Sequence, residues 1–270
     1  MTTKRMGEEQ FRWFHAIVVD NMDPEKLGRV KIRVTNDHDD PSIQNDDLPW
    51  ATPIGSITSA SHKQVGRSPT GLLPGSHVFG FFLDGHEKQL PILWGSFSKI
   101  PGGSQDNNDV PALAREINSL HKTIVGPEPS TPYAAKYPYN HVTQTQSGHI
   151  IEVDDTPSNE RLHVYHKSGS YIEVDKSGQV VVKSVDNSFD ITVKNKTVYI
   201  GGNIKVQIMG PADIQISGSA NMKASNWNIT GDIALHGTLR ADGDVIAGGI
   251  SLENHIHSEA EESQPTGKPI

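Results

Sequence analysis

The sequence predicts an all-β protein, in which a small closed barrel within residues 1–100 is followed by a trimeric β-helical prism over residues 147–253. Three observations predict this fold. Five short runs with strand-like alternation lie within the first hundred residues. No convincing amphipathic helix interrupts them. From residue 202 onward glycines recur every eight residues, with apolar and polar side chains alternating between them.

The composition limits the functions that the chain can perform. Lys and Arg number 24 against 32 Asp and Glu, a formal net charge of −8, which argues against a nucleic-acid binder with a broad basic face. Cysteine is absent, which excludes disulfides, thiolate metal sites and cysteine nucleophiles. The sequence shows no secretory signal and no apolar run of membrane-spanning length, so we expect a soluble chain made in the cytoplasm.

The first hundred residues are expected to form the barrel. In the second expected strand Val30, Ile32 and Val34 alternate with basic residues, which directs one face inward and the other to water. The five expected strands cover residues 11–19, 28–34, 50–57, 77–83 and 91–95.

Residues 101–146 have the composition of a linker. Gly, Ser, Asn and Asp dominate residues 101–109. A short helix is expected at 111–121, where Leu113, Ile117 and Leu120 follow the i, i+4, i+7 pattern. This segment is too short to enclose a catalytic domain. The chain is therefore divided into a barrel domain, this linker, a needle at 147–253, and an apex with its tail at 254–270.

The needle is predicted from two repeats. Residues 147–155 are echoed by residues 168–175. Further on, corner positions recur every eight residues at Gly202, Gly210, Gly218 and Asn226. An ordinary antiparallel meander is the alternative interpretation. The apolar residues between these corners occupy even positions: Val198, Ile200, Ile204, Val206, Ile208, Ala212, Ile214, Ile216, Ala220, Met222 and Ala224.

A single ribbon of this kind has nothing against which to bury its apolar face, and its edges stay open to other strands. Three chains wound about one axis solve both problems, so we expect an obligate homotrimer with a glycine at each tight corner. Beyond Asn226 the glycines fall six residues apart, at Gly231, Gly237 and Gly243. Shorter sides make smaller triangles, which predicts an apex that narrows toward the C-terminus.

The pair His255 and His257 is the candidate metal site. Residues i and i+2 of an extended chain point to the same side, so three chains bring six imidazole nitrogens to one axis. Six nitrogen donors favour an octahedral ion such as Fe(II) or Ni(II) over Zn(II). The alternative is two exposed histidines in a frayed tail.

No catalytic residues are predicted. The chain contains no P-loop, no Gly-x-Ser-x-Gly and no His-Glu-x-x-His motif. The other histidines, such as His149, His163 and His166, alternate with strand residues. We expect them to be surface or interchain hydrogen-bonding groups.

Several of these motifs resemble a known family. Residues 18–34 (VVDNMDPEKLGRVKIRV), with 48–50, 57–60 and 80–84, resemble the N-terminal OB domain of central spike proteins in contractile phage tails, closest to the T-even-like group. Residues 137–155 and 245–257, the latter reading VIAGGISLENHIH, resemble the baseplate assembly protein V and VgrG group.

This resemblance implies an OB-fold barrel that docks on a baseplate hub protein, and a trimeric needle that points at the host envelope. It also implies one iron ion held by His255 and His257 of three chains. T-even-like spikes carry a lysozyme domain between barrel and needle, where this chain has only residues 101–146. Peptidoglycan hydrolysis is therefore not expected, and the chain is predicted not to be an enzyme.

The predicted function is that of a structural spike in the virion tail baseplate, which pierces the host outer membrane when the sheath contracts. One alternative is a VgrG-like spike of a secretion system or tailocin. Another is a metal-dependent or peptidoglycan-degrading hydrolase. Six protein ligands would leave the metal no open position for water, which distinguishes a structural ion from a catalytic one. Whether a separate tip protein caps the spike stays open.

Overall fold

The computed structural model describes residues 12–63, 65–67, 71–98 and 128–256. Within these residues it contains twelve β-strands, two short 3-10 helices and no α-helix, which confirms the predicted all-β class. No helix in this part of the chain has the length and hydropathy needed to span a membrane. The helix predicted at 111–121, the second apex histidine His257 and the tail lie outside the described residues.

Five strands close into a barrel in the order β1-β2-β3-β5-β4. β3 pairs with β5 in parallel, and the other neighbouring strands are antiparallel. The five strands overlap the five that the sequence predicts, and the closed five-stranded barrel is that of an OB fold. The bounds are β1 (Arg12–Asp20), β2 (Val30–Val34), β3 (Trp50–Pro53), β4 (His77–Phe82) and β5 (Pro91–Phe97), with 3-10 helices η1 (Asn45–Asp47) and η2 (Gly85–Glu87).

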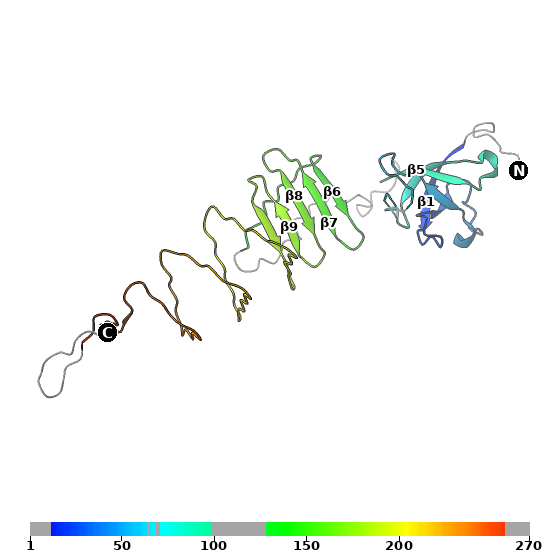
Figure 1. Cartoon of the computed structure of the whole chain (residues 1–270). Helices are drawn as coiled ribbons and strands as arrows, with labels where there is room; N and C mark the ends of the chain where they lie inside the picture. The colour runs from blue at the N-terminus through cyan, green and yellow to red at the C-terminus, as the bar shows by residue number, and fades with distance from the viewer. Residues whose placement is uncertain (1–11, 64, 68–70, 99–127, 257–270) are drawn as a thin grey trace, which may run out of the picture. The chain divides into compact units, whose positions relative to one another are not determined.

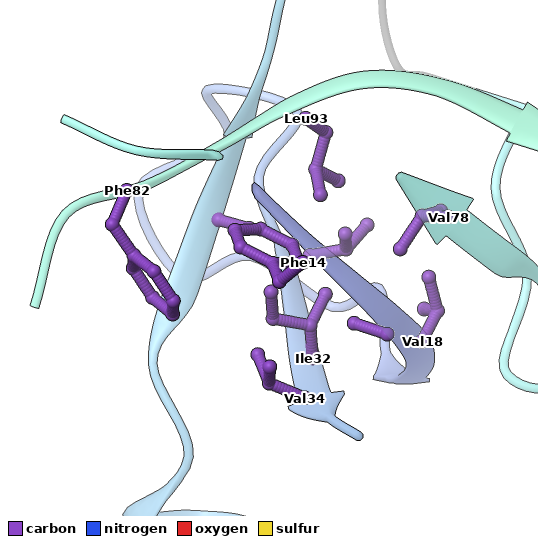
Figure 2. Packing of buried hydrophobic residues seen from close by; sticks show 10 residues of the cluster. Phe14, Val18, Ile32, Val34, Val78, Phe82 and Leu93 are labelled. Atoms are coloured by element: carbon purple, nitrogen blue, oxygen red, sulfur yellow. The ribbon is translucent and has the colours of Figure 1, made fainter. Parts of the chain in front are cut away.

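The barrel core follows from alternation along the strands. Inward side chains of β1 and β2 meet those of β4 and β5 on the barrel axis, as Figure 2 shows. Fully burying one such aliphatic or aromatic side chain stabilises the fold by roughly 1.5–3 kcal/mol. The core residues, each at most 5% exposed, are Phe14, Ala16, Val18, Val30, Ile32, Val34, Ala51, Val78, Phe82 and Leu93.

The turn between β1 and β2 is organised by one carboxylate. Asp23 accepts backbone N–H bonds from Glu25, Leu27 and Arg29, at 2.8 to 3.1 Å. It also pairs with the Arg29 guanidinium at 2.8 Å. Gly28 has a φ of +79°, a conformation that glycine adopts without strain. These contacts explain the conformation of the sequence motif at residues 18–34.

A second sheet follows, with five antiparallel strands in the order β10-β9-β8-β7-β6 (Figure 1). It begins at Asn140, inside the range 101–146 that the sequence assigns to the linker. The two copies of the predicted internal repeat contain β7 and β9. The strands are β6 (Asn140–Gln144), β7 (Ile150–Asp154), β8 (Arg161–Tyr165), β9 (Tyr171–Val174) and β10 (Val180–Lys183).

The chain divides after Lys194 into a second unit. From residue 184 to 245 no strand ladder is formed within the chain, and extended segments alternate with bends (Figure 1). The bends fall at 185–186, 193–194, 201–202, 209–210, 217–218 and 225, and then at 231, 236–237 and 242–243. A hairpin of β11 (Ile246–Ala247) and β12 (Ile250–Ser251) follows.

The structure predicts a sharp difference between two glycines of the barrel wall. A Cβ at Gly80 would lie 2.1 Å from the Ile92 carbonyl oxygen and 2.8 Å from the Phe14 ring, whereas a Cβ at Gly95 would meet nothing within 4 Å. We expect Gly80→Ala to lower the free energy of unfolding of the barrel by about 2–3 kcal/mol, because close-packed walls do not absorb extra volume. Gly95→Ala is the matched control. Equal urea midpoints for the two variants would contradict this packing.

Candidate assembly surfaces

The five-stranded sheet has an exposed aliphatic face. Two rows cross it, and in the first Ile151 pairs with Val164, Val164 with Ile172, and Ile172 with Val182. The second row follows the same pairing through Val153, Leu162, Val174 and Val180. Except for half-buried Val174, these residues are 40–72% exposed. Contiguous apolar surface of this kind marks an interaction site.

The opposite face of the same sheet carries charges and is covered. Arg161 donates a hydrogen bond to Glu173 at 2.8 Å and another to Glu152. His163 places Nδ1 3.4 Å from the Glu152 carboxylate, and Asn140 donates to that carboxylate at 2.6 Å. The two glutamates, Arg161 and His163 are each at most 4% exposed. We call Glu152, Arg161, His163 and Glu173 the buried charge cluster.

Residues 128–136 cover this face. Tyr133 lies with its ring 4.9 Å from the Arg161 guanidinium carbon. Glu128 accepts a hydrogen bond from the Tyr171 hydroxyl at 2.6 Å and pairs with Lys183 at 2.8 Å. Burial, then the Glu128 carboxylate, raises the pKa of Tyr171, so the tyrosine stays a hydrogen-bond donor. The charged face is therefore covered and its Arg161 is ion-paired inside one chain, whereas the aliphatic face is not covered.

The position of His163 corrects the sequence interpretation, which expected a surface or interchain histidine. His163 is 2% exposed and lies inside the buried charge cluster. Strict alternation along β8 showed that Arg161, His163 and Tyr165 share a face. It could not show that this polar face, rather than Leu162 and Val164, is the covered one. His166 is exposed and His149 is half-buried, with ring centroids 4.5 Å apart.

The buried charge cluster predicts acid sensitivity. Burial by itself would raise the pKa of Glu152, but hydrogen bonds from His163 and Asn140 and the Arg161 charge outweigh it and hold that pKa below its usual 4.5. A carboxyl with a lowered folded-state pKa contributes stability above its unfolded pKa and loses that contribution as the pH falls through the folded value.

We therefore expect thermal stability of the sheet to fall below pH 4.5 in the wild type. Glu152→Gln should flatten this acid dependence and cost about 3–5 kcal/mol at pH 7, because it leaves Arg161 under-paired. Exposed Glu160→Gln is the control. An unchanged acid profile in Glu152→Gln, measured by circular dichroism melts, would contradict the assignment.

In the second unit, the apolar residues of the eight-residue repeat are exposed. Each of Ile200, Ile204, Val206, Ile208, Ile214, Ile216 and Met222 is between 46% and 84% exposed. A Cβ built at Gly202, Gly210 or Gly218 meets no atom of the chain within 4 Å. Each of these glycines lies at a bend, and Asn226 directly follows the bend at 225. Contacts within one chain therefore do not require glycine at these corners.

The apex is a tight hairpin followed by His255. Gly248 and Gly249 form its turn with φ of +57° and +84°. The His255 backbone N–H donates to the Ser251 carbonyl at 3.1 Å, and ring atom Nδ1 lies 2.9 Å from the same oxygen. This contact favours the tautomer in which Nε2 carries the lone pair, the usual arrangement of a metal-binding histidine. No group of three or more metal-ligating residues occurs within the described part of a single chain.

Comparison with known proteins places the barrel in a defined class. Residues 32–162 match the model of the Gp5 N-terminal OB domain family. This match agrees with the OB-type strand order of the barrel and extends into the five-stranded sheet. Residues 32–162 are therefore similar to this domain.

Two relatives extend the comparison. The chain is 32% identical to Protein Gp5 of Vibrio phage KVP40 in an alignment that covers 77% of this chain and 65% of that protein. It is 42% identical to the pre-baseplate central spike protein Gp5 of Enterobacteria phage T4 over 87 residues, 32% of this chain and 15% of that protein. The predicted resemblance to central spike proteins of contractile phage tails is thereby confirmed.

Proposed function

We propose that the protein is the structural central spike of a contractile phage tail, a homotrimeric needle that crosses the host envelope. The observation that carries this proposal is the apolar surface that a single chain leaves uncovered, on the five-stranded sheet and along the repeat that follows it. Hydrophobic burial is worth roughly 25 cal/mol per Å², so this surface strongly favours association.

Other copies of the same chain fit both apolar surfaces, that of the five-stranded sheet and that of the repeat. The aliphatic rows of the sheet contain only Ile, Leu and Val, the composition of a core divided between obligate partners. The repeat continues the pattern with apolar residues at even positions and polar ones at odd positions. Three copies around one axis would cover every even position and pair the open strand edges.

The same packing gives the corner glycines a role. Nothing in the single chain crowds Gly202, Gly210 or Gly218, so the neighbours that require glycine would belong to the other two copies. From the bend at 225 onward the spacing shortens to six residues, which supports a narrowing apex. A continuously hydrogen-bonded prism of this form would resist bending under axial load.

The apex histidines fit a structural metal ion. With Nδ1 of His255 directed at the Ser251 carbonyl, Nε2 is the nitrogen suited to ligation. Adding His257, three chains supply six imidazoles, a set that favours Fe(II). The ion would tie the three chain ends together at the point. A fully protein-ligated ion offers no position for a reacting water, so its role is structural.

The work of penetration would come from sheath contraction, and the spike would supply stiffness and a point that contacts the host outer membrane only transiently. Both relatives are phage proteins, and the T4 relative is named for the baseplate, which favours a virion location over a secretion system or tailocin. The barrel would dock on a hub protein. The function is mechanical rather than catalytic, so clearing of peptidoglycan in a zymogram by the purified protein would contradict it.

Substitutions at two neighbouring positions, whose side chains would point in opposite directions, test the trimer. Ile214 is even-numbered and would face the axis, whereas Gln215 would face water. Ile214→Asp should lower the stability of the trimer by about 3 kcal/mol per chain, since it places a charge in an apolar contact. Gln215→Asp should change it little. Equal effects of the two substitutions on the melting temperature and on the elution volume would contradict the trimeric prism.

The metal site is tested by replacing its proposed ligands. Wild-type protein should contain one iron per three chains, and His255→Ala or His257→Ala should remove it, because a missing ligand breaks the octahedral set. The exposed His236→Ala is the control and should retain the metal. Elemental analysis of the purified trimers measures the ratio. Iron retained in a His255→Ala, His257→Ala double variant would refute the site.

A further inference from the structure

The barrel carries an exposed aromatic face that its core does not use. Trp13 of β1 stacks on Phe79 of β4, with ring centroids 4.9 Å apart and planes at 10°. Trp94 of β5 meets Trp13 edge-on at 6.1 Å. The three rings are 46%, 40% and 64% exposed, respectively. None belongs to the buried cluster that holds the barrel together, shown in Figure 2.

This face continues with a pair of histidines. His15 and His77 share a hydrogen bond of 3.0 Å between Nε2 and Nδ1, and Phe97 packs on both rings. Burial, then the neighbouring His77, lowers the pKa of His15, so that ring is neutral at pH 7. We call Trp13, His15, His77, Phe79, Trp94 and Phe97 the aromatic face. None of these six residues is a Lys, Arg, Asp or Glu.

An open groove adjoins this face beside Trp94. It has a volume of about 350 Å³ and passes between the loop after β3 and strand β5. Its lining also contains no charged residue. The lining residues are Pro53, Ile54, Gly71, Leu72, Ser76, Leu93, Trp94, Gly95 and Ser96. A projecting aromatic ridge next to an uncharged recess suits a partner with an apolar side chain to insert and no charge to desolvate.

The chemistry of this face differs from that of the surfaces assigned to self-association. Those surfaces are aliphatic, as in the divided core of an obligate oligomer. The barrel face is built from Trp, Phe and His, and Trp is among the residues enriched where a few side chains dominate binding to a different protein.

We propose that the aromatic face and its groove dock on an uncharged, apolar surface of a second protein, the baseplate component that holds the spike. This inference rests on the proposed function and assigns the surface through which the barrel performs it. Trp94 is the central contact, because it belongs both to the ring cluster and to the wall of the groove.

The test uses the full chain supplied to cells infected with the phage from which the spike gene has been deleted. The quantity measured is the number of spike chains per purified tail baseplate. Trp94→Ala should reduce incorporation at least tenfold, because it removes the central contact. Leu27→Ala, at the same 64% exposure on the β1–β2 turn, is the matched control and should leave incorporation unchanged.

A second pair of variants tests the groove. Ser96→Asp places a charge in the uncharged lining and should reduce incorporation at least tenfold, whereas Ser96→Thr should not. All variants should elute as trimers when free, at the volume of the wild type. This requirement separates docking on a partner from contacts between copies.

Incorporation of Trp94→Ala equal to that of Leu27→Ala would overturn the proposal. So would dissociation of the free Trp94→Ala trimer on size-exclusion chromatography, because the face would then contact another copy of the chain. If the wild-type chain itself is missing from purified tails, the proposed function fails rather than this assignment alone.

Discussion

One face of the five-stranded sheet is covered within the chain and the other is exposed, and the proposed assembly depends on this difference. In most sheets of soluble proteins the apolar face is buried within the chain and the polar face meets water. Here residues 128–136 cover the polar face, while the aliphatic rows that include Ile151 and Val164 remain exposed. We propose that a chain which pairs these charges internally and leaves its aliphatic side chains exposed completes its core with other copies.

The buried charge cluster makes this arrangement specific. Arg161 is held between Glu152 and Glu173, and a buried ion pair broken at one partner costs several kcal/mol. A sheet that turned this cluster outward and its aliphatic rows inward would lose those pairings. The cluster therefore determines which face is presented for assembly. The ion pairs that stabilise one chain therefore also keep its aliphatic rows exposed, and these rows are the surface proposed to contact the next copy.

Sequence patterns predicted some features well and others not at all. The barrel was predictable because alternation in residues such as Val30, Ile32 and Val34 coincides with burial inside one chain. The beginning of the five-stranded sheet at Asn140 was not, because short polar strands such as β6 share the composition of a linker. The burial of His163 was also missed, because alternation shows which residues share a face but not which face is covered. The aromatic face escaped notice because Trp13, Phe79 and Trp94 are far apart in sequence and meet only when the barrel closes.

The proposed function depends on three chains that share one apolar axis. Native mass spectrometry of the untagged protein tests this arrangement. Each chain has a mass of 29.4 kDa, so the mass of the complex gives the number of copies whatever its shape. We expect a single species of three chains carrying one iron ion. A metal-free trimer would remove the role given to the apex histidines and leave the needle intact. A stable monomer at micromolar concentration would contradict the account.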